Sequence, residues 1–477
     1  MTIAATPPPA ETAPTTGIPE GDLELVVSLT DSSVGSYRVS PSRVGGKASS
    51  LATLYATEGL GSKVPKAHAL TVDFFGPWID ELTETDDFRA LSQTMEAVDN
   101  KKPLTEDQQA MATSLCAKLQ ASSLQLDLSE AQSEAIRRLH HELNGRLAAV
   151  RSSAPEEDGS GASFAGAFET KLAVETTYEG LEQAVKECFA SLWDYRVLLY
   201  KQTQHQGNNG EKNNTTSVGF AVVVMEMVDS VIAGVAFSAN PLNSDRDELV
   251  IDSSWGLGES VVDGSVTADR YVVDKLQQPF RIMEESLGKK GNEKRLGAGG
   301  VVTKSIEEQD PRYSKSSLTP KQIEELSQLV CLIETTYGMP MDVEWAFVTN
   351  EDEDKNSLEL TPKLLQARPI TTLFAIDPEM MTKPGEKRRL YFDFNVLSEA
   401  TTTTPFTTMD MDVYCKVFTT AALAVSLEEI ETKNIVFFQP SDSNSIIYNG
   451  RTRQYFNMGF AFKYADPQFL AEVSTIL

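Results

Sequence analysis

The chain has 477 residues, 41% of them hydrophobic and 23% charged, and this length suits roughly two to four domains that each bury a core. The formal net charge of −27 argues against a broad surface for nucleic acid or for an anionic membrane, while leaving room for a local basic pocket. The four cysteines, at positions 116, 188, 331 and 415, lie far apart and lack metal-binding spacing, which favours reduced thiols in a cytoplasmic protein.

The N-terminal segment, residues 1–22, is rich in Pro, Thr and Ala, and no Lys or Arg precedes Arg38. A secretory signal needs a basic start before an apolar stretch, and a transit peptide needs Arg, so this composition fits neither. We therefore expect a disordered tail over residues 1–22. The most apolar run, residues 220–228, is too short to cross a bilayer, so we expect no membrane span.

The segment after the tail begins with a predicted strand over residues 23–27 and continues with a helix that opens at Gly45-Gly46-Lys47. Two glycines before a helix start can place the Lys47 ammonium, together with free backbone N–H groups, on a phosphate. So short a motif is also common at protein surfaces, and an ordinary surface lysine is the alternative. Helices are expected over most of residues 85–145.

A short apolar strand over residues 147–150 leads into Arg151, two serines and a loop rich in Gly, Ser and Ala over residues 158–166. Strand ends beside flexible loops are places where phosphate sites are built, so Arg151 is a candidate phosphate ligand. The alternative is a solvated arginine at a strand end. An amphipathic helix is predicted over residues 178–202, and a mobile polar loop over residues 206–217.

The second half of the chain changes from helical to extended patterns. Strands are predicted over residues 221–228, 233–238 and 249–253, followed by a tight turn at residues 255–259 that can lie near a ligand or serve structure alone. A helix over residues 319–338 has Thr and Pro at its start, a Gln that completes a capping box, and Gly at its end. This order of elements predicts a mixed class of helices and strands.

Two alternating runs near residue 350 carry the strongest signal for a site. In the first, Asp342 and Glu344 share one side of a strand, and in the second, Gln366 and Arg368 do the same. The acidic, turn-rich residues 350–356 between them predict an antiparallel hairpin that gathers these side chains on one surface. Carboxylate and amide oxygens suit Mg²⁺, and a guanidinium suits phosphate. The alternative is an ordinary half-buried hairpin with a polar outer face.

Taken in order, these segments resemble the ATP-binding part of the phosphoenolpyruvate synthase, pyruvate phosphate dikinase and rifampicin phosphotransferase group. The resemblance covers roughly residues 40–373 and rests on seven ordered blocks, which together are far more specific than any one of them. The blocks are Gly45-Gly46-Lys47; Val150-Arg151-Ser152-Ser153-Ala154 with Glu157-Asp158; Ala162-Ser163-Phe164-Ala165-Gly166 leading to Thr170; Gly234-Val235-Ala236-Phe237-Ser238 with Pro241; Trp255-Gly256-Leu257-Gly258-Glu259; Asp342 to Trp345; and Gln366-Ala367-Arg368-Pro369.

The resemblance implies an α+β protein of ATP-grasp type, in which ATP binds between a Lys-bearing N-terminal subdomain and a sheet-bearing C-terminal one. Carried over by position, it implies that Lys47, Arg151 and Arg368 act on the phosphates as the catalytic cations. It also implies that Glu344 and Gln366 hold Mg²⁺. This assignment agrees with what the hairpin pattern predicts from its residues alone, since metal and guanidinium neutralise charge on a transferring phosphoryl group.

The resemblance further implies a loop that covers the phosphates, to which Gly166 and Thr170 belong. Met225 stands where the group commonly has a Gln near the adenine, so the base contacts at this position are left open. Ala48 replaces the glycine that usually follows Gly-Gly-Lys, and this replacement slightly stiffens the turn.

Enzymes of this group pass the phosphate through a histidine on a separate swivelling domain. The histidines of this chain, His68, His140, His141 and His205, all lie in the ATP-binding part, and none follows a serine. We therefore expect that a separate phosphohistidine domain is needed before a small-molecule acceptor is phosphorylated, the chain being either a truncated gene product or one that works with a second chain. Residues 390–477 loosely resemble the start of the substrate-binding domain of the rifampicin-phosphotransferase branch, so the chain resembles the first half of such an enzyme.

Three functions remain open at this point. The first is a dikinase-type phosphotransferase module acting on a small hydroxylated metabolite, the second a fragment of a pyruvate or phosphoenolpyruvate dikinase, and the third a nucleotide-binding module without turnover. The expected division is a tail at 1–22, an N-terminal ATP-grasp subdomain at 23–215, a C-terminal one at 216–375, and an incomplete segment like a substrate-binding domain at 376–477.

Overall fold

The structure of the protein is a computed structural model that describes most of the first 373 residues and three strands beyond them. The described residues are 24–31, 35–96, 105–155, 169–199, 219–297, 299–349 and 360–373, with strands at 391–393, 447–450 and 453–457. The predicted tail, the predicted loop over residues 206–217, Gly166 and His205 lie outside them. Within the described part, no helix is both long enough and apolar enough to cross a membrane.

The chain divides into two compact units, residues 1–373 and residues 374–477. In the second unit, the described strands form one antiparallel sheet in the order β14 (Tyr391–Asp393), β16 (Arg453–Asn457) and β15 (Ile447–Gly450). The incomplete domain expected over residues 376–477 stays a prediction.

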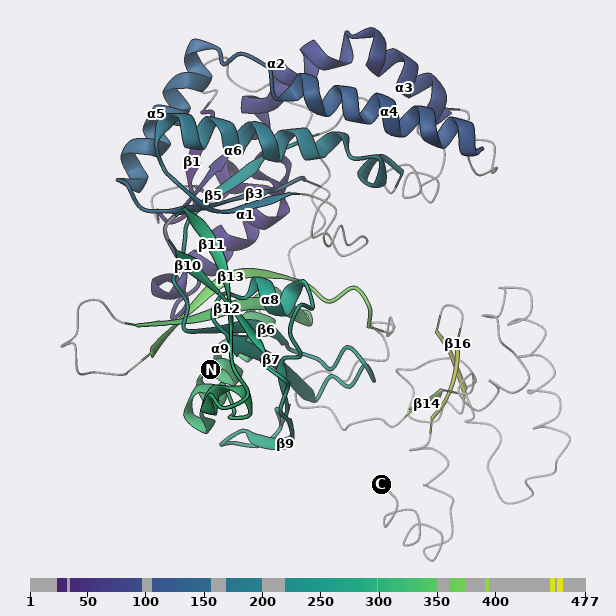
Figure 1. The fold of residues 1–477 in the computed structure, drawn as a ribbon. Helices are drawn as coiled ribbons and strands as arrows, with labels where there is room; N and C mark the ends of the chain where they lie inside the picture. The colour runs from purple at the N-terminus through teal and green to yellow at the C-terminus, as the bar shows by residue number, and fades with distance from the viewer. Residues whose placement is uncertain are drawn as a thin grey trace, which may run out of the picture. The chain divides into compact units, whose positions relative to one another are not determined.

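The first unit contains a five-stranded antiparallel sheet in its N-terminal part (Figure 1). Its strands lie in the order β1 (Val26–Ser28), β2 (Ala67–Leu70), β5 (Val222–Glu226), β3 (Ala148–Ser152) and β4 (Thr170–Val174). The strand β5 follows the proposed subdomain boundary at residue 215, yet it pairs with β2 and β3 of this sheet. A first subdomain that contains this whole sheet therefore extends at least to Glu226.

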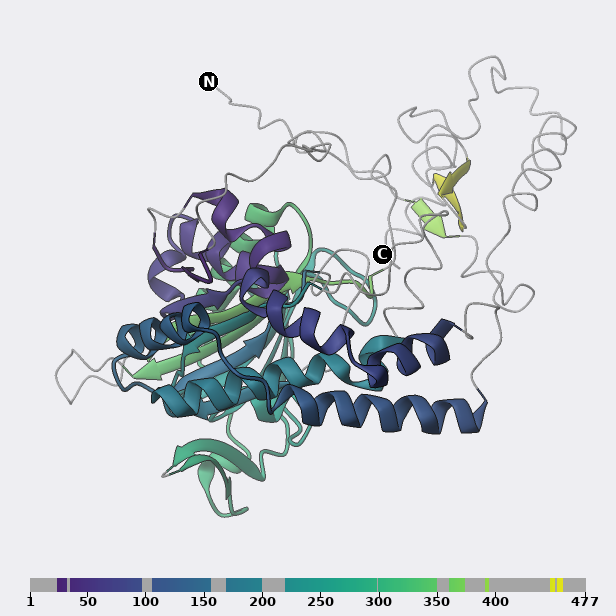
Figure 2. The same cartoon turned by 90° about the horizontal axis from the view of Figure 1, so that it is seen from above.

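Helices cover one face of this sheet in a layer that Figure 2 shows from above. They are α2 (Val72–Thr83), α3 (Asp86–Glu96), α4 (Glu106–Ser123), α5 (Glu130–Leu143) and α6 (Tyr178–Ala190). Phe74, Phe75, Trp78 and Phe189 are fully or almost fully buried beneath them and pack as one aromatic cluster. Thr105 and Ser129 begin α4 and α5 with capping boxes, which satisfies N–H groups that a helix start leaves open.

The helix predicted over residues 178–202 is shorter than expected. Helix α6 ends at Ala190, a 3-10 turn covers Ser191–Trp193, and a separate helical stretch starts at Tyr195. The break has a local cause, because the Ser191 hydroxyl donates to the Cys188 carbonyl at 2.6 Å and the Asp194 carboxylate accepts the Arg196 N–H at 2.8 Å. Both side chains compete with the backbone ladder of a continuing helix.

The second sheet of the first unit is antiparallel and has six strands. Its order is β13 (Leu360–Pro369), β12 (Met341–Thr349), β6 (Ile232–Phe237), β7 (Glu248–Trp255), β8 (Asp269–Asp274) and β9 (Arg281–Ser286). The helix α9 (Pro320–Tyr337) packs on it, with the predicted capping box at Thr319 and Gln322 and with Gly338 in the left-handed conformation at its end. The short helix α8 (Glu259–Val262) follows β7.

A second hydrophobic core joins the two sheets through the helix α1 (Pro41–Ala56). Leu51 and Leu54 of α1 are almost fully buried in this core, together with Met225 from the free face of the first sheet and Trp345 from the second. The chain is therefore α+β, with antiparallel sheets as predicted, and α1 lies on the opposite face of the first sheet from the helical layer.

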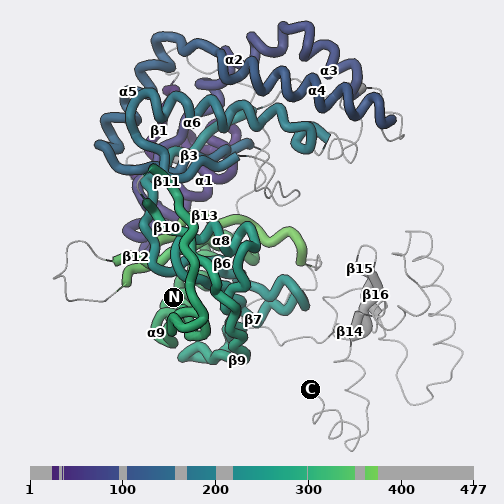
Figure 3. The backbone as a smooth tube through the Cα atoms, viewed as in Figure 1, coloured from purple at the N-terminus to yellow at the C-terminus, as the bar shows by residue number. Residues whose placement is uncertain are grey.

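A separate hairpin runs from the second sheet toward the first (Figure 3). It consists of β10 (Asn292–Gly297) and β11 (Gly300–Ser305), which pair antiparallel. Its base is bridged to Gly256 through Lys294, and β11 contacts β4 of the first sheet. The hairpin thus touches elements of both sheets. Short 3-10 turns complete the described unit at Ser36–Val39, Gly61–Lys63 and Pro311–Tyr313.

Candidate nucleotide and metal site

The Gly-Gly-Lys turn lies directly against the segment that follows β3. Gly45 has a φ of 80°, which interrupts α1, and the position of an added Cβ there lies 1.6 Å from the Ser153 carbonyl oxygen. The Ser153 hydroxyl donates to the Val44 carbonyl at 2.9 Å. Only glycine allows this approach, so the two phosphate candidates Lys47 and Arg151 are held on neighbouring backbone segments.

The expectation of free backbone N–H groups at this turn is wrong for two of them. The Gly46 N–H donates to the Ala154 carbonyl at 3.1 Å, and the Ala48 N–H donates to the Ser153 hydroxyl at 3.1 Å. Both donors therefore hold the turn together instead of facing a ligand. The Lys47 ammonium donates to the Ser152 carbonyl at 3.2 Å, which keeps it beside the end of β3.

The predicted hairpin of residues 341–369 is confirmed as β12 and β13. Asp342 pairs with Arg368 and Glu344 pairs with Gln366 in its register, so the four polar side chains share one surface. The Arg368 guanidinium contacts the Asp342 carboxylate at 2.9 and 2.8 Å. The register shifts after Glu344, so that Leu365 is an extra residue on β13, and such bulges redirect side chains beside binding sites.

An ion pair between Arg151 and Glu344 connects the two sheets. The Arg151 guanidinium donates to the Glu344 carboxylate at 2.9 Å, and the two side chains are only 15% and 20% exposed. Burial by itself raises the pKa of Glu344, but the charge and hydrogen bond of Arg151 outweigh it, with help from the charges of Arg368 and Lys47, and hold the pKa below its ordinary value. Glu344 is therefore ionised at neutral pH and is surrounded by the three candidate cations.

Two polar atoms at this ion pair have no hydrogen-bond partner among the described residues. They are the Gln366 Oε1, on a side chain that is 3% exposed, and the Arg151 Nε. Buried polar atoms are nearly always satisfied, so these two suit a ligand, an ion or water. An amide oxygen beside an ionised carboxylate is a donor set that Mg²⁺ accepts. The described residues contain no cluster of three or more His, Cys, Asp or Glu side chains that could form another kind of metal site.

A cavity of about 190 Å³ opens beside the Arg151–Glu344 pair, between the two sheets. Its apolar lining consists of Ala149, Leu172, Met225, Met227, Val228, Gly234, Leu257, Gly258, Val262, Trp345 and Leu365, and its polar lining of Arg151, Thr170, Glu226, Ser230, Glu259, Asp263 and Glu344. The structure thus brings Arg151, Thr170, Met225 and Glu344 together. A mostly apolar cavity of this kind suits a flat heterocycle, and Arg151 is the cation that lines it.

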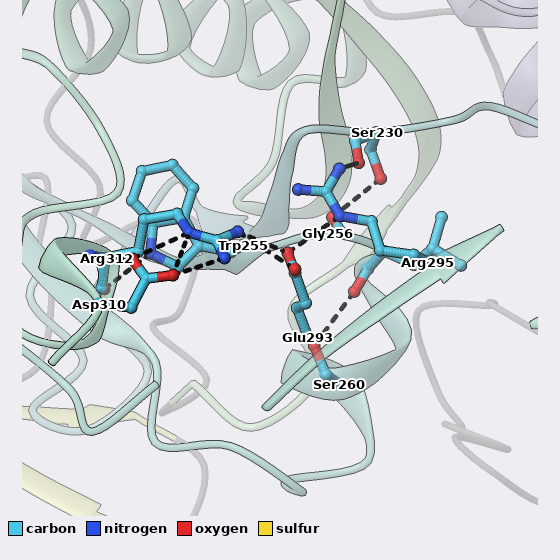
Figure 4. A network of polar contacts seen from close by, with 9 residues as sticks. Ser230, Trp255, Gly256, Ser260, Glu293, Arg295, Asp310 and Arg312 are labelled. Carbon is cyan, nitrogen blue, oxygen red and sulfur yellow. Dashed lines mark hydrogen bonds and ion pairs between the residues drawn. The ribbon is translucent and has the colours of Figure 1, made fainter. Parts of the chain in front are cut away.

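The far wall of this cavity is held by a polar network that sequence reasoning missed (Figure 4). The Ser230 hydroxyl donates to the Gly256 carbonyl at 2.9 Å, and Arg295 donates to the Ser230 carbonyl at 3.0 Å. Glu293 accepts from Arg295 at 2.9 Å and from Arg312 at 3.1 Å. Glu293 and Arg295 lie on the strand β10, and their partners Arg312 and Ser230 come from distant loops. The sequence near β10 therefore gives no sign of these contacts.

The turn predicted at residues 255–259 lies at the cavity, and its place near a ligand stays a prediction. Leu257, Gly258 and Glu259 line the cavity, and the Leu257 N–H donates to the Lys294 carbonyl at 2.8 Å. The Lys294 ammonium bridges the carboxylates of Glu259 at 3.0 Å and Asp263 at 2.6 Å. The hairpin of β10 and β11 therefore anchors this wall from outside.

The described histidines lie away from the cavity. His68 is 1% exposed on β2, and burial, reinforced by the charge of Lys66, lowers its pKa to about 4. The Nδ1 of His140 lies 2.5 Å from the Thr176 carbonyl, and His141 is exposed on α5. None of the three lines the cavity that holds Arg151 and Glu344.

Comparison with known proteins places this arrangement in a family. The sequence model described as "Pyruvate phosphate dikinase, AMP/ATP-binding domain" matches residues 41–388. The phosphoenolpyruvate synthase of Pyrococcus furiosus is 38% identical over 287 residues, which are 58% of this chain and 32% of that protein. The prodigiosin synthesizing transferase PigC of Serratia marcescens is 33% identical over 369 residues, 77% of this chain and 36% of PigC. The uncharacterized phosphotransferase YvkC of Bacillus subtilis is 40% identical over 246 residues, 52% of this chain and 26% of YvkC.

The matched segment includes the Gly-Gly-Lys turn, the end of β3 and the hairpin of β12 and β13. The chain spans between about a quarter and just over a third of the length of these relatives. The chain belongs to the family of the pyruvate phosphate dikinase AMP/ATP-binding domain.

Proposed function

We propose that ATP with Mg²⁺ binds at the cavity beside the Arg151–Glu344 pair. In this proposal the chain is the nucleotide-binding part of a dikinase-type phosphotransferase for a small hydroxylated metabolite. The observation that carries the proposal is the joint placement of the Arg151–Glu344 pair, the unpartnered Gln366 oxygen and an apolar cavity. The family match and the phosphotransferase names of relatives support it. The three described cysteines are free, which supports a cytoplasmic location.

In this proposal the cavity takes the base, and the cations take the triphosphate. Met225, on the first sheet, and Leu365, on the second, offer apolar surface to the two faces of the adenine. Lys47, Arg151 and Arg368 stabilise the charge of the phosphates, with Thr170 at the start of β4 and Gly166 in the covering loop before it. Glu344 and Gln366 hold Mg²⁺, which supplies further charge neutralisation at the phosphate oxygens when it is bound.

The group that accepts the phosphoryl group from ATP would belong to a part of the enzyme outside this cavity. We propose that a phosphohistidine domain, on a second chain or a further segment, carries the phosphoryl group to the small-molecule acceptor. A second candidate function is pyruvate or phosphoenolpyruvate dikinase chemistry, which the names of the archaeal relatives favour. A nucleotide-binding module without turnover is the third.

The test of nucleotide binding is calorimetric titration of the chain with ATP in the presence and absence of Mg²⁺. Replacing Arg368 by Ala should weaken binding, because each charge-assisted hydrogen bond to a phosphate contributes about 1.5–3 kcal/mol, or roughly tenfold or more in Kd. Arg137→Ala is the matched control, because Arg137 is exposed on α5 and forms ion pairs with Glu130 and Glu134 of the same helix. Unchanged affinity in Arg368→Ala would remove that residue from the site, and absence of ATP binding by the wild type would contradict the proposed function.

The chain alone should bind ATP without becoming stoichiometrically phosphorylated on histidine. Its described histidines lie away from the cavity, and His68 is buried on β2. The measurement is incubation with labelled ATP, followed by separation under alkaline conditions that preserve phosphohistidine. Stoichiometric label that disappears in a His68→Asn, His140→Asn, His141→Asn or His205→Asn variant would show that the chain carries its own acceptor.

A further inference from the structure

Three residues from distant parts of the chain meet beside the proposed phosphate site. The Ser50 hydroxyl donates to the Ala367 carbonyl at 2.5 Å and lies 2.8 Å from the Tyr337 hydroxyl. The Tyr337 hydroxyl also donates to the Ser50 carbonyl at 3.0 Å. These contacts join α1, the last residue of α9, and β13, which forms one edge of the six-stranded sheet.

These residues connect α1, which carries Lys47, to the two strands of the second sheet that carry the proposed phosphate and metal ligands, β12 and β13. Ser50 lies about one helical turn after Lys47 on α1, so a shift in the position of Ser50 also shifts Lys47. Ala367 lies between Gln366 and Arg368 on β13. Tyr337 ends α9, and the chain then turns through Gly338 into β12, which carries Glu344.

The chemical state of Tyr337 suits this contact. Burial raises the pKa of its hydroxyl, although hydrogen bonds with Ser50 and Thr53 oppose the rise. The hydroxyl therefore stays protonated and can donate over the whole physiological pH range. Helix α1 is already held by the burial of Leu51 and Leu54, so packing alone accounts for its attachment to the fold. The polar contacts add a directional restraint between α1 and β13, because a hydrogen bond is directional and apolar packing is not.

We propose that Ser50 and Tyr337 form a latch that positions Lys47 against Gln366 and Arg368, so that the triphosphate meets its ligands from both sheets in one geometry. Both are positioning residues, since neither lines the cavity. The inference rests on the proposed function, because it assigns the latch to the triphosphate end of the ATP site. The affinity for a ligand that contacts both Lys47 and the Gln366–Arg368 strand should depend on the latch. The affinity for a ligand confined to the apolar cavity should not.

The test compares two ligands, ATP with Mg²⁺ and adenosine, on the full chain and on two variants, Tyr337→Phe and Ser50→Ala. Each variant should weaken binding of ATP with Mg²⁺ by about 3- to 10-fold, the size of one lost internal hydrogen bond, and leave adenosine affinity unchanged. The double variant should lose more than either single variant, because Tyr337→Phe leaves the hydrogen bond from the Ser50 hydroxyl to the Ala367 carbonyl, and Ser50→Ala leaves the one from the Tyr337 hydroxyl to the Ser50 carbonyl. Tyr55→Phe, which removes a tyrosine hydroxyl from the same helix outside the latch, is the control and should bind both ligands as the wild type does.

The possible outcomes separate the latch from the proposed function. If the wild type binds ATP and the variants bind it equally well, the latch is overturned while the proposed function stands. Equal weakening of ATP and adenosine would also overturn the latch, because it would show a general loss of structure. A wild type that fails to bind ATP would overturn the proposed function and the latch with it.

Discussion

Replacing Arg151 by Met should lower the free energy of unfolding by about 2–4 kcal/mol, because it leaves the Glu344 carboxylate in a mostly buried place without its ion-pair partner. Glu344 is 20% exposed and keeps the more distant charges of Arg368 and Lys47, so the loss should fall short of that of a fully buried orphan charge. The measurement is the midpoint and slope of urea unfolding, with Arg137→Met as the surface control.

The double variant Arg151→Met with Glu344→Leu distinguishes the structural part of the pair from its proposed ligand role. Removing both charges leaves no unpaired group, so it should recover most of the stability that Arg151→Met loses. It should still fail to bind ATP with Mg²⁺ at the wild-type affinity, because a phosphate cation and a metal ligand are both absent. A double variant that recovers stability and also binds normally would show that the pair is structural only.

The same pair gives a pH dependence whose sign follows from the lowered pKa of Glu344. A carboxylate with a folded-state pKa below its ordinary value of 4.5 adds stability above about pH 4.5, and this contribution is lost as the pH falls through the folded pKa. The difference in stability between the wild type and Arg151→Met should therefore be constant near neutral pH and shrink in acid. A difference that grows on acidification would contradict the assignment.

The parts of the site that could be predicted are those whose signal is local. The hairpin of β12 and β13 follows from alternation on both sides of an acidic turn, and its register then places Glu344 opposite Gln366. The helix α9 follows from its capping box and its terminal glycine. In both cases the residues that determine the element lie within one continuous segment, Thr319 to Gly338 for the helix and Met341 to Pro369 for the hairpin, so that one stretch of sequence contains the whole argument.

The parts that could not be predicted depend on contacts between distant segments. The partner of Arg151 lies 193 positions away, and that of Ser50 lies 317 positions away. The strand β5 pairs with β2 and β3 because its apolar residues complete a sheet that began before residue 70, which no local pattern of β5 reveals. The N–H groups of Gly46 and Ala48 likewise find their acceptors, Ala154 and Ser153, more than 100 positions later in the chain.

Replacing Gly45 by Ala should lower the free energy of unfolding by about 3 kcal/mol or more, among the largest effects of any single methyl group in this chain. Two costs combine at this position. The φ of 80° is unfavourable for any residue with a Cβ, and the added Cβ would lie 1.6 Å from the Ser153 carbonyl oxygen. That oxygen is backbone, so the segment after Arg151 would have to move with it, and the turn that carries Lys47 would separate from the end of β3.

Gly59→Ala is the matched control for this prediction. Gly59 has a nearly equal φ of 85°, but the nearest atom to an added Cβ is the Leu332 Cδ2 at 3.7 Å, which is ordinary contact. This variant should therefore lose only the backbone cost of roughly 1–2 kcal/mol. The difference between the two urea midpoints measures the close approach of the Lys47 turn to the Arg151 segment. Equal losses would mean that the two segments separate easily, and that the cations they carry are not held together by the fold.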